Sequence, residues 1–422
     1  MKDVKMKGFS EALKVEEAWK KYNDKLTLKT LPSEEVLVSE SLQRVLAEDI
    51  YSEVNVPHFN RSAMDGYALR SEDTYGASPN NPVIFDVVGA IEIGETSAVA
   101  IEQNHAVRIS TGAPLPECSN AVVMVEHTSQ ISERRITVYQ PLTPWKNVSR
   151  VGEDVKVGEK VLAKGTLLRP QDVGILAAIG KSKIKIVKKP QVAIMSTGNE
   201  LIEPGTQPSL GKTIDVNRQI LSAMVKDLGC IPIDLGIVRD EIEVLKTKVA
   251  EGLERADLVL VSGGTSVGSK DMVPDAVSSL GKPGIVVHGV SIRPGKPVAL
   301  AAINGKPVIL LPGYPAAMMI AFYTFAKRVL ASIQRLPPKF GEIKIQAKVT
   351  ERIPSTAGVR DFIRVHVVKD KGSYVVKSIS SKGAGIISSM VKANGLISIP
   401  EGKEGLEKGE EVDVTLLRTL ED

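Results

Sequence analysis

The chain has 422 residues, of which 43% are hydrophobic and 25% are charged, a composition typical of globular proteins. Its length exceeds one typical hydrophobic core, so we expect about two to four domains. The net charge of +4 is spread along the chain, which argues against a role in binding nucleic acid or a membrane surface. No apolar run approaches the roughly 20 residues that span a bilayer. The charged N-terminus (residues 1–9) has no following apolar h-region, so we expect no signal peptide.

The N-terminal half combines helical segments with a β-rich module. Apolar residues at helical spacing predict a helix over residues 10–22 with Ser10 as its N-cap, and a second short helix over 39–48. Pro170 is suited to the first turn of a helix over 171–179. From about residue 54 to 141, β-rich runs alternate with Pro, Gly and Asn, which indicates a compact β module. Its expected strands are at 83–88, 107–110, 122–126 and 136–140.

From Pro190 onward, strand patterns alternate with helices of about ten or more residues. This alternation predicts right-handed βαβ crossovers and a three-layer α/β domain with a mostly parallel sheet. We expect strands at 192–196, 231–238, 258–262, 285–290, 298–302 and 308–311, and helices at 218–228, 241–256, 272–280 and 316–333. The segment 336–339 is the clearest linker. Beyond it, strand patterns at 343–349, 362–368, 374–379, 396–400 and 412–417 predict a small β domain.

The most informative segment is the glycine-rich loop that follows the strand at 258–262. Its glycines permit positive φ and the close approach of a ligand to the backbone, and its hydroxyl side chains add donors. A strand, a glycine loop and a helix N-terminus together form an anion cradle, so we expect a phosphorylated or oxyanionic ligand. The loop is not a P-loop, because Ser269 intervenes before Lys270; a tight turn of small residues is the alternative. The loop residues are Gly263, Gly264, Thr265, Ser266, Gly268 and Ser269.

Polar clusters follow several strands of the predicted α/β sheet. Ligands bind beyond the carboxyl ends of such strands, so we expect these clusters to share one rim. Glu200, Asp240 and Asp271 supply the oxygen ligands that Mg²⁺ prefers when it also binds substrate phosphates, and Arg293 and Lys296 supply positive charge for phosphates or an oxyanion. Taken singly, each carboxylate is more simply a helix cap or part of a surface ion pair. The clusters are Ser196–Glu200, Arg239–Asp240, Gly263–Asp271, Arg293–Lys296 and Pro312–Pro315.

The cysteines and histidines do not indicate a metal centre. Cys118 and Cys230 are the two cysteines; they lie far apart and form no CxxC pattern, which fits a reducing cytosol. Five histidines occur without HExxH spacing. Any metal would therefore be held by carboxylates.

Three segments of the N-terminal half place charged or hydroxyl residues beside glycine. They are Pro57–Tyr67, Arg108–Pro114 and Arg150–Asp154. Structural turns explain each of them adequately.

At these motifs the chain resembles the MoeA and gephyrin E type of molybdopterin molybdenumtransferases. The resemblance covers essentially the whole chain, and the motifs occur in the family's order. SAMDGYA (62–68) together with SGGTSVG (262–268) is highly specific. The other matching segments are STGAPLP (110–116), GED (152–154), STGNEL (196–201), GIVRD (236–240), RPGKP (293–297), LPGYP (311–315) and, more weakly, ANGLISIP (393–400).

The resemblance implies the last step of molybdenum cofactor assembly. Adenylylated molybdopterin meets molybdate, or tungstate, and its phosphoanhydride is hydrolysed with the help of Mg²⁺. AMP leaves, and the metal is placed on the dithiolene. The resemblance also implies a cytoplasmic homodimer with its active cleft between subunits, and a transient contact with the adenylyltransferase of the same pathway.

The resemblance further implies a multidomain α/β plus β architecture. An elongated N-terminal domain comprises residues 1–54 and 142–189, and a β lid is inserted at 55–141. The α/β molybdopterin-binding domain covers 190–335, and a C-terminal β domain covers 340–422.

Position by position, the resemblance implies which residues act. The chain departs from the family pattern at Arg293, which replaces a lysine, and at Tyr314, which replaces a small amide. Arginine is a wider, flatter donor than lysine, so the geometry of oxyanion binding would differ. The implied catalytic residues are Asp65, Thr111, Asp154, Glu200, Asp240 and Asp271, the last three also binding metal. The implied substrate-binding residues are Ser262, Gly263, Gly264, Thr265, Ser266, Gly268, Arg293, Lys296, Pro312, Gly313, Tyr314 and Pro315.

Two other functions stay open. One is ATP-dependent adenylylation of molybdopterin, since those enzymes share the glycine-loop domain; the lid-type N-terminal half and the C-terminal β domain argue against it. The other is a non-catalytic scaffold, which some relatives also serve as. A long linker or partner-binding extension would favour the scaffold, and the sequence shows none.

Overall fold

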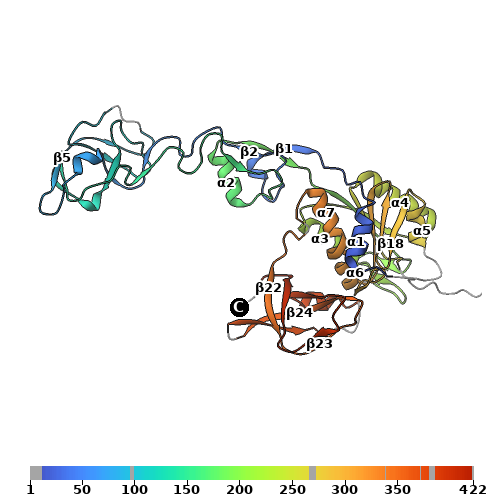
Figure 1. Cartoon of the computed structure of the whole chain (residues 1–422). Coiled ribbons are helices and arrows are strands. Elements are labelled where there is room, and N and C mark those ends of the chain that lie inside the picture. The colour runs from blue at the N-terminus through green and yellow to red at the C-terminus, as the bar shows by residue number, and fades with distance from the viewer. Residues whose placement is uncertain are drawn as a thin grey trace, which may run out of the picture. The chain divides into compact units, whose positions relative to one another are not determined.

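The computed structural model describes residues 12–95, 99–265, 272–337, 339–370, 372–379 and 385–420 (Figure 1). The chain divides into two compact units. Unit 1 consists of Met1–Glu34 with Val187–Asp422, and unit 2 consists of Glu35–Ile186. Each unit has hydrophobic cores of its own.

The α/β part of unit 1 is built on a mixed sheet. Among the described strands only β20 opposes the common direction, because the pairs from β16 to β21 are parallel and β20 is antiparallel to both of its neighbours. The expectation of a mostly parallel sheet is therefore confirmed. The strand order is β16 (Ile231–Val238), β13 (Gln191–Thr197), β17 (Leu258–Ser262), β21 (Lys306–Leu311), β20 (Ala299–Ile303) and β18 (Pro283–His288).

Helices cover both faces of this sheet, which gives the expected three layers (Figure 1). One face packs on Tyr22, Leu221 and Phe325, and the opposite face on Val249 and Val277. The central strand β17 is buried at all its positions, as expected for a strand covered on both sides. The first face is covered by α1 (Val15–Asn23), α3 (Asn217–Asp227), α6 (Pro315–Ala321) and α7 (Lys327–Gln334), and the second by α4 (Ile242–Arg255) and α5 (Met272–Ser278).

A single helical segment, Pro315–Gln334, contains α6, a π-helical turn η4 (Phe322–Ala326) and α7. By length and composition this segment could cross a membrane, so the expectation that no apolar segment approaches that length is wrong. However, 78% of its most apolar stretch is buried inside the protein. It is apolar because it is a core helix.

The C-terminal part of unit 1 is a small β barrel. The sheet closes on itself because β24 pairs with both β25 and β26. The short strand β19 comes from the α/β part and pairs in parallel with β24, which ties the barrel to the α/β sheet. The strand order is β19 (Ile292–Arg293), β24 (Arg360–Asp370), β25 (Ser373–Ser378), β22 (Lys344–Val349), β28 (Glu411–Leu416) and β26 (Gly395–Ile399). Smaller elements of unit 1 are α8 (Ile387–Lys392) and the pairs β23 (Ile353–Pro354) with β27 (Gly405–Leu406) and β14 (Leu201–Ile202) with β15 (Thr213–Ile214).

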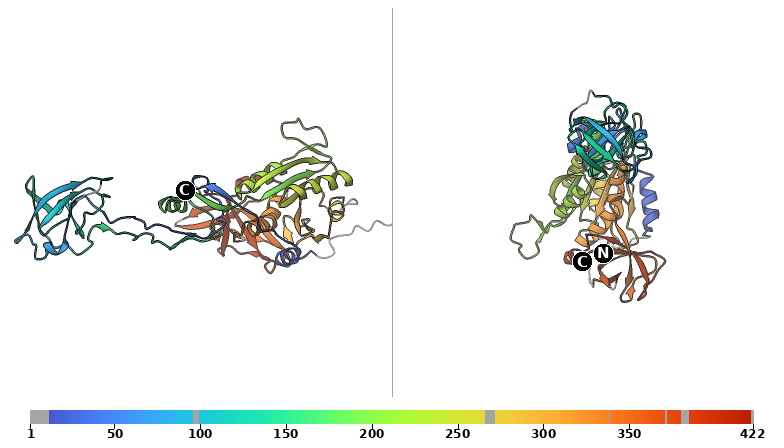
Figure 2. Two further views of the ribbon diagram at one scale, coloured as in Figure 1. Left: turned by 90° about the horizontal axis from the view of Figure 1, so that it is seen from above. Right: turned by 90° about the vertical axis from the view of Figure 1, so that its left-hand side faces the viewer.

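Unit 2 contains the expected β module as a separate sheet, drawn in blue to teal in Figure 2. Two small clusters of buried apolar side chains pack on it. Its strand order is β7 (Ala121–Met124), β4 (Gly66–Leu69), β6 (His105–Ile109), β5 (Val83–Ile91), β9 (Arg135–Val138) and β8 (Thr128–Ser132). Single turns of 3-10 helix flank these strands at η2 (Ser71–Thr74) and η3 (Val125–His127).

The rest of unit 2 consists of short strand pairs and one helix, and a third core contains apolar residues of α2, β2, β11 and β12. The helix α2 (Pro170–Ala178) begins at the expected proline. The strand pairs are β1 (Ser33–Leu37) with β12 (Lys183–Val187), β2 (Ile50–Tyr51) with β11 (Lys160–Leu162) and β3 (Arg61–Ser62) with β10 (Val148–Ser149).

Two N-terminal expectations differ from the structure. The helix predicted over 39–48 is wrong: only a short turn η1 (Val38–Glu40) forms. Gln43 has a φ of +58°, which cannot continue a right-handed helix, and Val45 and Leu46 form isolated β-bridges in which both are buried. At the start of the chain α1 begins after Lys14, and Ser10, the expected N-cap, lies outside the described residues.

The lysine-rich segment 181–189 contains the strand β12. Buried isoleucines alternate with exposed lysines along this strand, and three lysines of the segment pair with glutamates of neighbouring segments. The ion pairs are Lys181–Glu53, Lys183–Glu35 and Lys185–Glu48.

Candidate functional site

The polar clusters predicted from the sequence lie at the same edge of the α/β sheet. β13, β16, β17 and β21 run in parallel and end there. The register of His288 with Ala299, and of Ala299 with Leu310, brings the turn between β18 and β20 to this edge as well. The described parts of all five clusters therefore share one rim. Ser266, Gly268 and Asp271 lie outside the described residues, so the structure does not place them.

The first residues of the glycine loop lie too close to neighbouring atoms for any side chain. Gly263 has a φ of +103°, and a Cβ there would lie 2.3 Å from the carbonyl oxygen of Thr197. Gly264 has a φ of +63°, and its Cβ would lie 2.3 Å from Cγ2 of Val273. The amide of Gly263 donates to the carbonyl of Leu311 at 3.0 Å. The loop therefore begins in a fixed geometry with its backbone at the rim.

Asp240 and Glu200 lie on two loops that hydrogen-bond to each other. Oδ1 of Asp240 accepts from the hydroxyl of Thr197 at 2.5 Å, and Oδ2 accepts from the amide of Asn199 at 3.3 Å. The Glu200 carboxylate folds over Gly198, where a Cβ would lie 2.7 Å from its Oε1. Two of the three predicted metal carboxylates thus belong to one small region.

No group of three His, Cys, Asp or Glu side chains suited to a metal occurs within the part of the chain that the structure describes. Glu200 and Asp240 are consistent with Mg²⁺ all the same. Mg²⁺ is usually held by one or two carboxylates and completes its coordination with waters and substrate phosphates.

Arg293 does not extend freely into the rim. Its Nε donates to Oδ2 of Asp361 at 3.0 Å, and its Nη2 contacts the same oxygen. Nη1 donates to the hydroxyl of Thr356 at 3.1 Å. The hydrogen bond that Arg293 donates to Asp361 raises the pKa of Arg293 above its ordinary value, while burial opposes this. The charge of Arg293 is therefore balanced by a carboxylate that is only 2% exposed.

A cavity of about 570 Å³ lies between the loop of Arg293 and the barrel. Lys296 and Tyr314 line it from the α/β part, and Arg364 lines it from the barrel. Arg364 is buried, and its Nη1 donates to the hydroxyl of Ser389 at 3.1 Å. Burial lowers the pKa of Arg364, and nearby Asp361 partly restores it. A pocket with several cationic groups in low dielectric suits a small anion.

The sequence analysis missed Asp361 and Arg364 because both fall within or beside an apolar strand pattern. A signal was present in the sequence: the β pattern FIRVHV places a charged arginine among apolar residues. A charge at a buried strand position normally needs a partner or a ligand.

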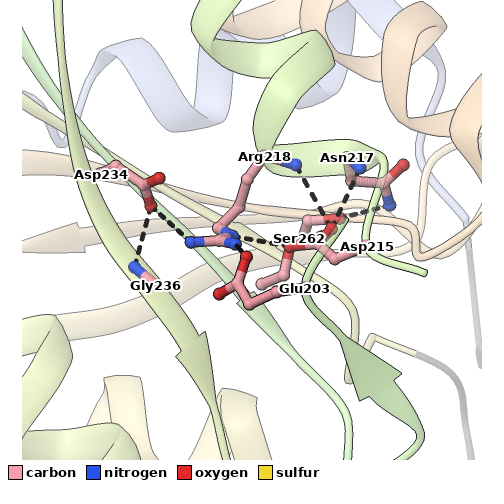
Figure 3. A network of polar contacts seen from close by, with 8 residues as sticks. Glu203, Asp215, Asn217, Arg218, Asp234, Gly236 and Ser262 are labelled. Carbon is pink, nitrogen blue, oxygen red and sulfur yellow. Dashed lines mark hydrogen bonds and ion pairs between the residues drawn. The ribbon is translucent and has the colours of Figure 1, made fainter. Parts of the chain in front are cut away.

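A second group that the sequence analysis missed lies at the start of α3. Arg218 is 4% exposed and is held by three carboxylates (Figure 3). Its Nε donates to Asp215 at 2.6 Å, Nη1 to Asp234 at 2.9 Å and Nη2 to Glu203 at 2.5 Å. Asn217, next to Arg218, is also buried. The sequence signal is a run of polar residues that opens an amphipathic helix, which is usually no more than a cap.

In unit 2, the structure joins two of the three predicted residues. The amide and the hydroxyl of Thr111 both donate to Oδ1 of Asp65, at 2.7 and 2.9 Å. These bonds, the backbone one first, lower the pKa of Asp65 below its ordinary value. Asp154 is exposed on another turn, where its amide donates to the carbonyl of Val56 at 3.1 Å.

Comparison with known proteins gives matches along nearly the whole chain. Residues 13–180 match the MoeA N-terminal region (domain I and II), 193–332 a probable molybdopterin binding domain, and 346–417 the MoeA C-terminal region (domain IV). A relative from Methanocaldococcus jannaschii is 40% identical over 392 residues, which cover 91% of this chain and 92% of that protein. The chain belongs to the MoeA family.

Further MoeA relatives agree in sequence and fold. A protein of Bacillus subtilis named molybdopterin molybdenumtransferase is 32% identical over 391 residues, covering 92% of this chain and 90% of its own length. The crystal structure of the molybdopterin biosynthesis moeA protein from Pyrococcus horikoshii matches with a TM-score of 0.83 and 34% identity, covering 96% of this chain and 100% of that one. The resemblance inferred from the motifs and the multidomain α/β plus β fold class are thereby confirmed.

Proposed function

We propose that this protein is a molybdopterin molybdenumtransferase that inserts molybdenum into molybdopterin. The observation that supports this most strongly is the arrangement of the rim. An anion-binding glycine loop, two carboxylates and a cationic cavity lie along one sheet edge of a MoeA chain. The relatives that bear the name molybdopterin molybdenumtransferase match over 92% of this chain.

In this proposal the substrates are adenylylated molybdopterin and molybdate or tungstate. The amide of Gly264 and the hydroxyls of Ser262 and Thr265 bind the pterin phosphate, as amides and hydroxyls at a strand end bind anions. Gly263, whose amide already donates to Leu311, lets the phosphate approach the backbone closely. The Pro312–Pro315 turn forms the neighbouring wall.

The metal oxyanion occupies the cavity. Lys296 and Arg364 bring positive charge to it, and Tyr314 shapes its opening. Arg293 acts there through Asp361, because its guanidinium is already held by that carboxylate.

Glu200 and Asp240, with Asp271 from the glycine-loop segment, hold Mg²⁺ in this proposal. The ion would neutralise charge on the phosphoanhydride during its hydrolysis to AMP. Thr197 fixes the orientation of Asp240 by donating to one of its oxygens, which leaves the carboxylate preorganised for the metal.

We further propose a cytoplasmic homodimer. Asp65, Thr111 and Asp154 belong to unit 2, and the rim belongs to unit 1. In the dimer, the paired Asp65 and Thr111 of one copy complete the rim of the other. A transient contact with the adenylyltransferase that makes the substrate is part of the same proposal.

The test is AMP release from adenylylated molybdopterin. The purified protein is incubated with this substrate, Mg²⁺ and either molybdate or tungstate, and AMP is followed with time. The proposal requires release that depends on both Mg²⁺ and the oxyanion. Consumption of ATP with unadenylylated molybdopterin, and no AMP from the adenylylated form, would instead identify an adenylyltransferase. Light scattering of the eluting protein tests the dimer.

A further inference from the structure

The side chain of Asn217 joins two loops of the rim. Its Nδ2 donates to the hydroxyl of Ser262 at 2.8 Å (Figure 3). The same nitrogen donates to the carbonyl of Gly313 at 2.7 Å. Ser262 ends β17 directly before the glycine loop, and Gly313 lies in the turn after β21. These loops are in contact, since a Cβ on Gly313 would lie 3.7 Å from Cα of Gly263. One amide group therefore spans the two loops that form neighbouring walls of the proposed pterin site.

This amide is not arranged for stability alone. Asn217 is 6% exposed, and its Oδ1 is buried without a hydrogen-bond partner among the described residues. Leaving a buried amide oxygen unpaired costs stability. The Nδ2 group donates both of its hydrogens, one to Ser262 and one to Gly313, and both acceptors lie at the rim. The constraint on this position is therefore the spacing of the loops rather than the packing of the helix.

The backbone amide of Asn217 donates to the buried carboxylate of Asp215. Oδ1 of Asp215 accepts from the amide of Asn217 and from the hydroxyl of Ser196, each at 3.0 Å. Arg218 balances the charge of Asp215. Ser196 belongs to β13, so the start of α3 is tied to three adjacent strand ends of the sheet. A side chain fixed in this way can transmit a precise position to the loops.

We propose that Asn217 is a positioning residue for the pterin substrate. It fixes the separation of the described start of the glycine loop, residues 263–265, from the Pro312–Pro315 turn, so that a phosphorylated pterin held by both segments adopts one geometry. Asn217 itself does not touch the reacting atoms. The inference rests on the proposed function, because it assigns the substrate of that site to these two loops.

The test compares two equally buried amides that contact opposite ends of α3. Gln334 is also 6% exposed, and its Nε2 donates to the carbonyls of Leu228, just after α3, and Leu330. Steady-state AMP release is measured for the wild type, Asn217→Ala and Gln334→Ala with adenylylated molybdopterin, Mg²⁺ and molybdate, and thermal unfolding is measured for each. Asn217→Ala is expected to raise KM for adenylylated molybdopterin about tenfold. Gln334→Ala is expected to lower the unfolding midpoint and leave KM unchanged.

Two further variants, Ser262→Ala and the double variant Asn217→Ala with Ser262→Ala, show which hydrogen bond of Asn217 changes KM. If the bond between Asn217 and Ser262 carries part of the positioning, the two changes in KM combine less than additively. If Asn217→Ala does not fold, Asn217→Asp replaces it. The aspartate has the same shape and can accept from Ser262, but it cannot donate to the carbonyl of Gly313, so KM still rises.

The outcomes separate the inference from the proposed function. A wild-type protein that releases no AMP refutes the function whatever the variants do. An active wild type, with Asn217→Ala or Asn217→Asp at the wild-type KM and kcat, overturns the positioning role, even if the unfolding midpoint falls.

Discussion

Gly264 combines two constraints that can be separated experimentally. Its φ of +63° disfavours any side chain, and a Cβ there would also lie 2.3 Å from Val273. Gly358 has a similar φ of +83° with nothing within 4 Å of its ideal Cβ. Gly358→Ala therefore reports the backbone penalty alone, about 1 kcal/mol. Gly264→Ala should lower the free energy of unfolding by a further 1–3 kcal/mol or so. Chemical denaturation measures both; equal losses would show that Val273 yields without cost.

Asp240 is proposed to bind Mg²⁺ and Lys296 to bind the oxyanion, so their variants should change the dependence of AMP release on different ions. Asp240→Asn keeps the shape but weakens the proposed metal site, so AMP release should require more Mg²⁺. Lys296→Ala removes one cation from the cavity, so the molybdate concentration for half-maximal release should rise about tenfold. Titrating each ion separately against each variant distinguishes the two roles. Wild-type dependence on Mg²⁺ in Asp240→Asn would remove the metal assignment.

Two of the residues missed from the sequence, Asn217 and Asp361, have partners that are distant along the chain. Asn217 acts through Gly313, 96 positions away, and Arg293 is balanced by Asp361, 68 positions away. Local patterns reveal that a residue is polar and near a turn, but they do not reveal which distant group it meets. The rim itself was predictable, because the carboxyl ends of parallel strands must share an edge.

At the level of elements, Glu16 joins three segments of unit 1. Its carboxylate, on α1, accepts from Arg328 of α7 at 2.9 Å and from Arg360 of β24 at 3.3 Å. The hydrogen bond from Arg328 contributes most to lowering the pKa of Glu16 to about 2, from 4.5. A carboxylate whose pKa falls on folding stabilises the folded state above its unfolded pKa, and this contribution is lost as the pH falls toward the folded pKa.

Glu16→Gln is therefore expected to destabilise unit 1 at pH 7. The side chain is 59% exposed, so we expect a loss of only about 0.5–1 kcal/mol. The difference from the wild type should shrink as the pH falls from 4.5 toward 2. Thermal unfolding between pH 7 and 3 measures this difference. The control is Glu17→Gln, because the carboxylate of Glu17 accepts a 3.4 Å hydrogen bond from the amide of Lys14. A difference that is constant over this range would rule out the ion pairs as its cause.

Strands and helices were predictable where burial is uniform along an element. β17 is buried throughout, so it appears as a continuous apolar run. β12 was missed because lysines alternate with its isoleucines, and the charges obscured a period of two that was present in the sequence. The false helix at 39–48 failed because Gln43 adopts a positive φ, which composition does not indicate.

At the level of the whole molecule, unit 2 is an insertion with adjacent ends. The chain leaves unit 1 at Glu34 and returns at Val187, and the amide of Lys188 donates to the carbonyl of Pro32 at 3.0 Å. A short Gly-Ser linker joining residues 34 and 187 should therefore leave a folded unit 1, with an unfolding midpoint within about 5 °C of the full chain.

The unfolding of the shortened protein can be measured by the fluorescence of Trp19. The chain has two tryptophans; Trp19 belongs to unit 1 and Trp145 to unit 2, so the shortened protein retains only Trp19. A cooperative transition of Trp19 shows that unit 1 folds alone. A broad transition would mean that its stability depends on unit 2. The shortened protein should release no AMP, because it lacks Asp65 and Thr111.

The ion pair between Arg293 and Asp361 affects how strongly this wall of the cavity attracts dissolved anions. A bare lysine at this wall would attract dissolved anions such as chloride along with the substrate. The arginine and its buried aspartate present a dipole instead, whose field falls off faster with distance than that of a single charge. Chloride should therefore compete weakly at Arg293 itself, and the contribution of this position to substrate capture should vary less with ionic strength than that of an unpaired lysine.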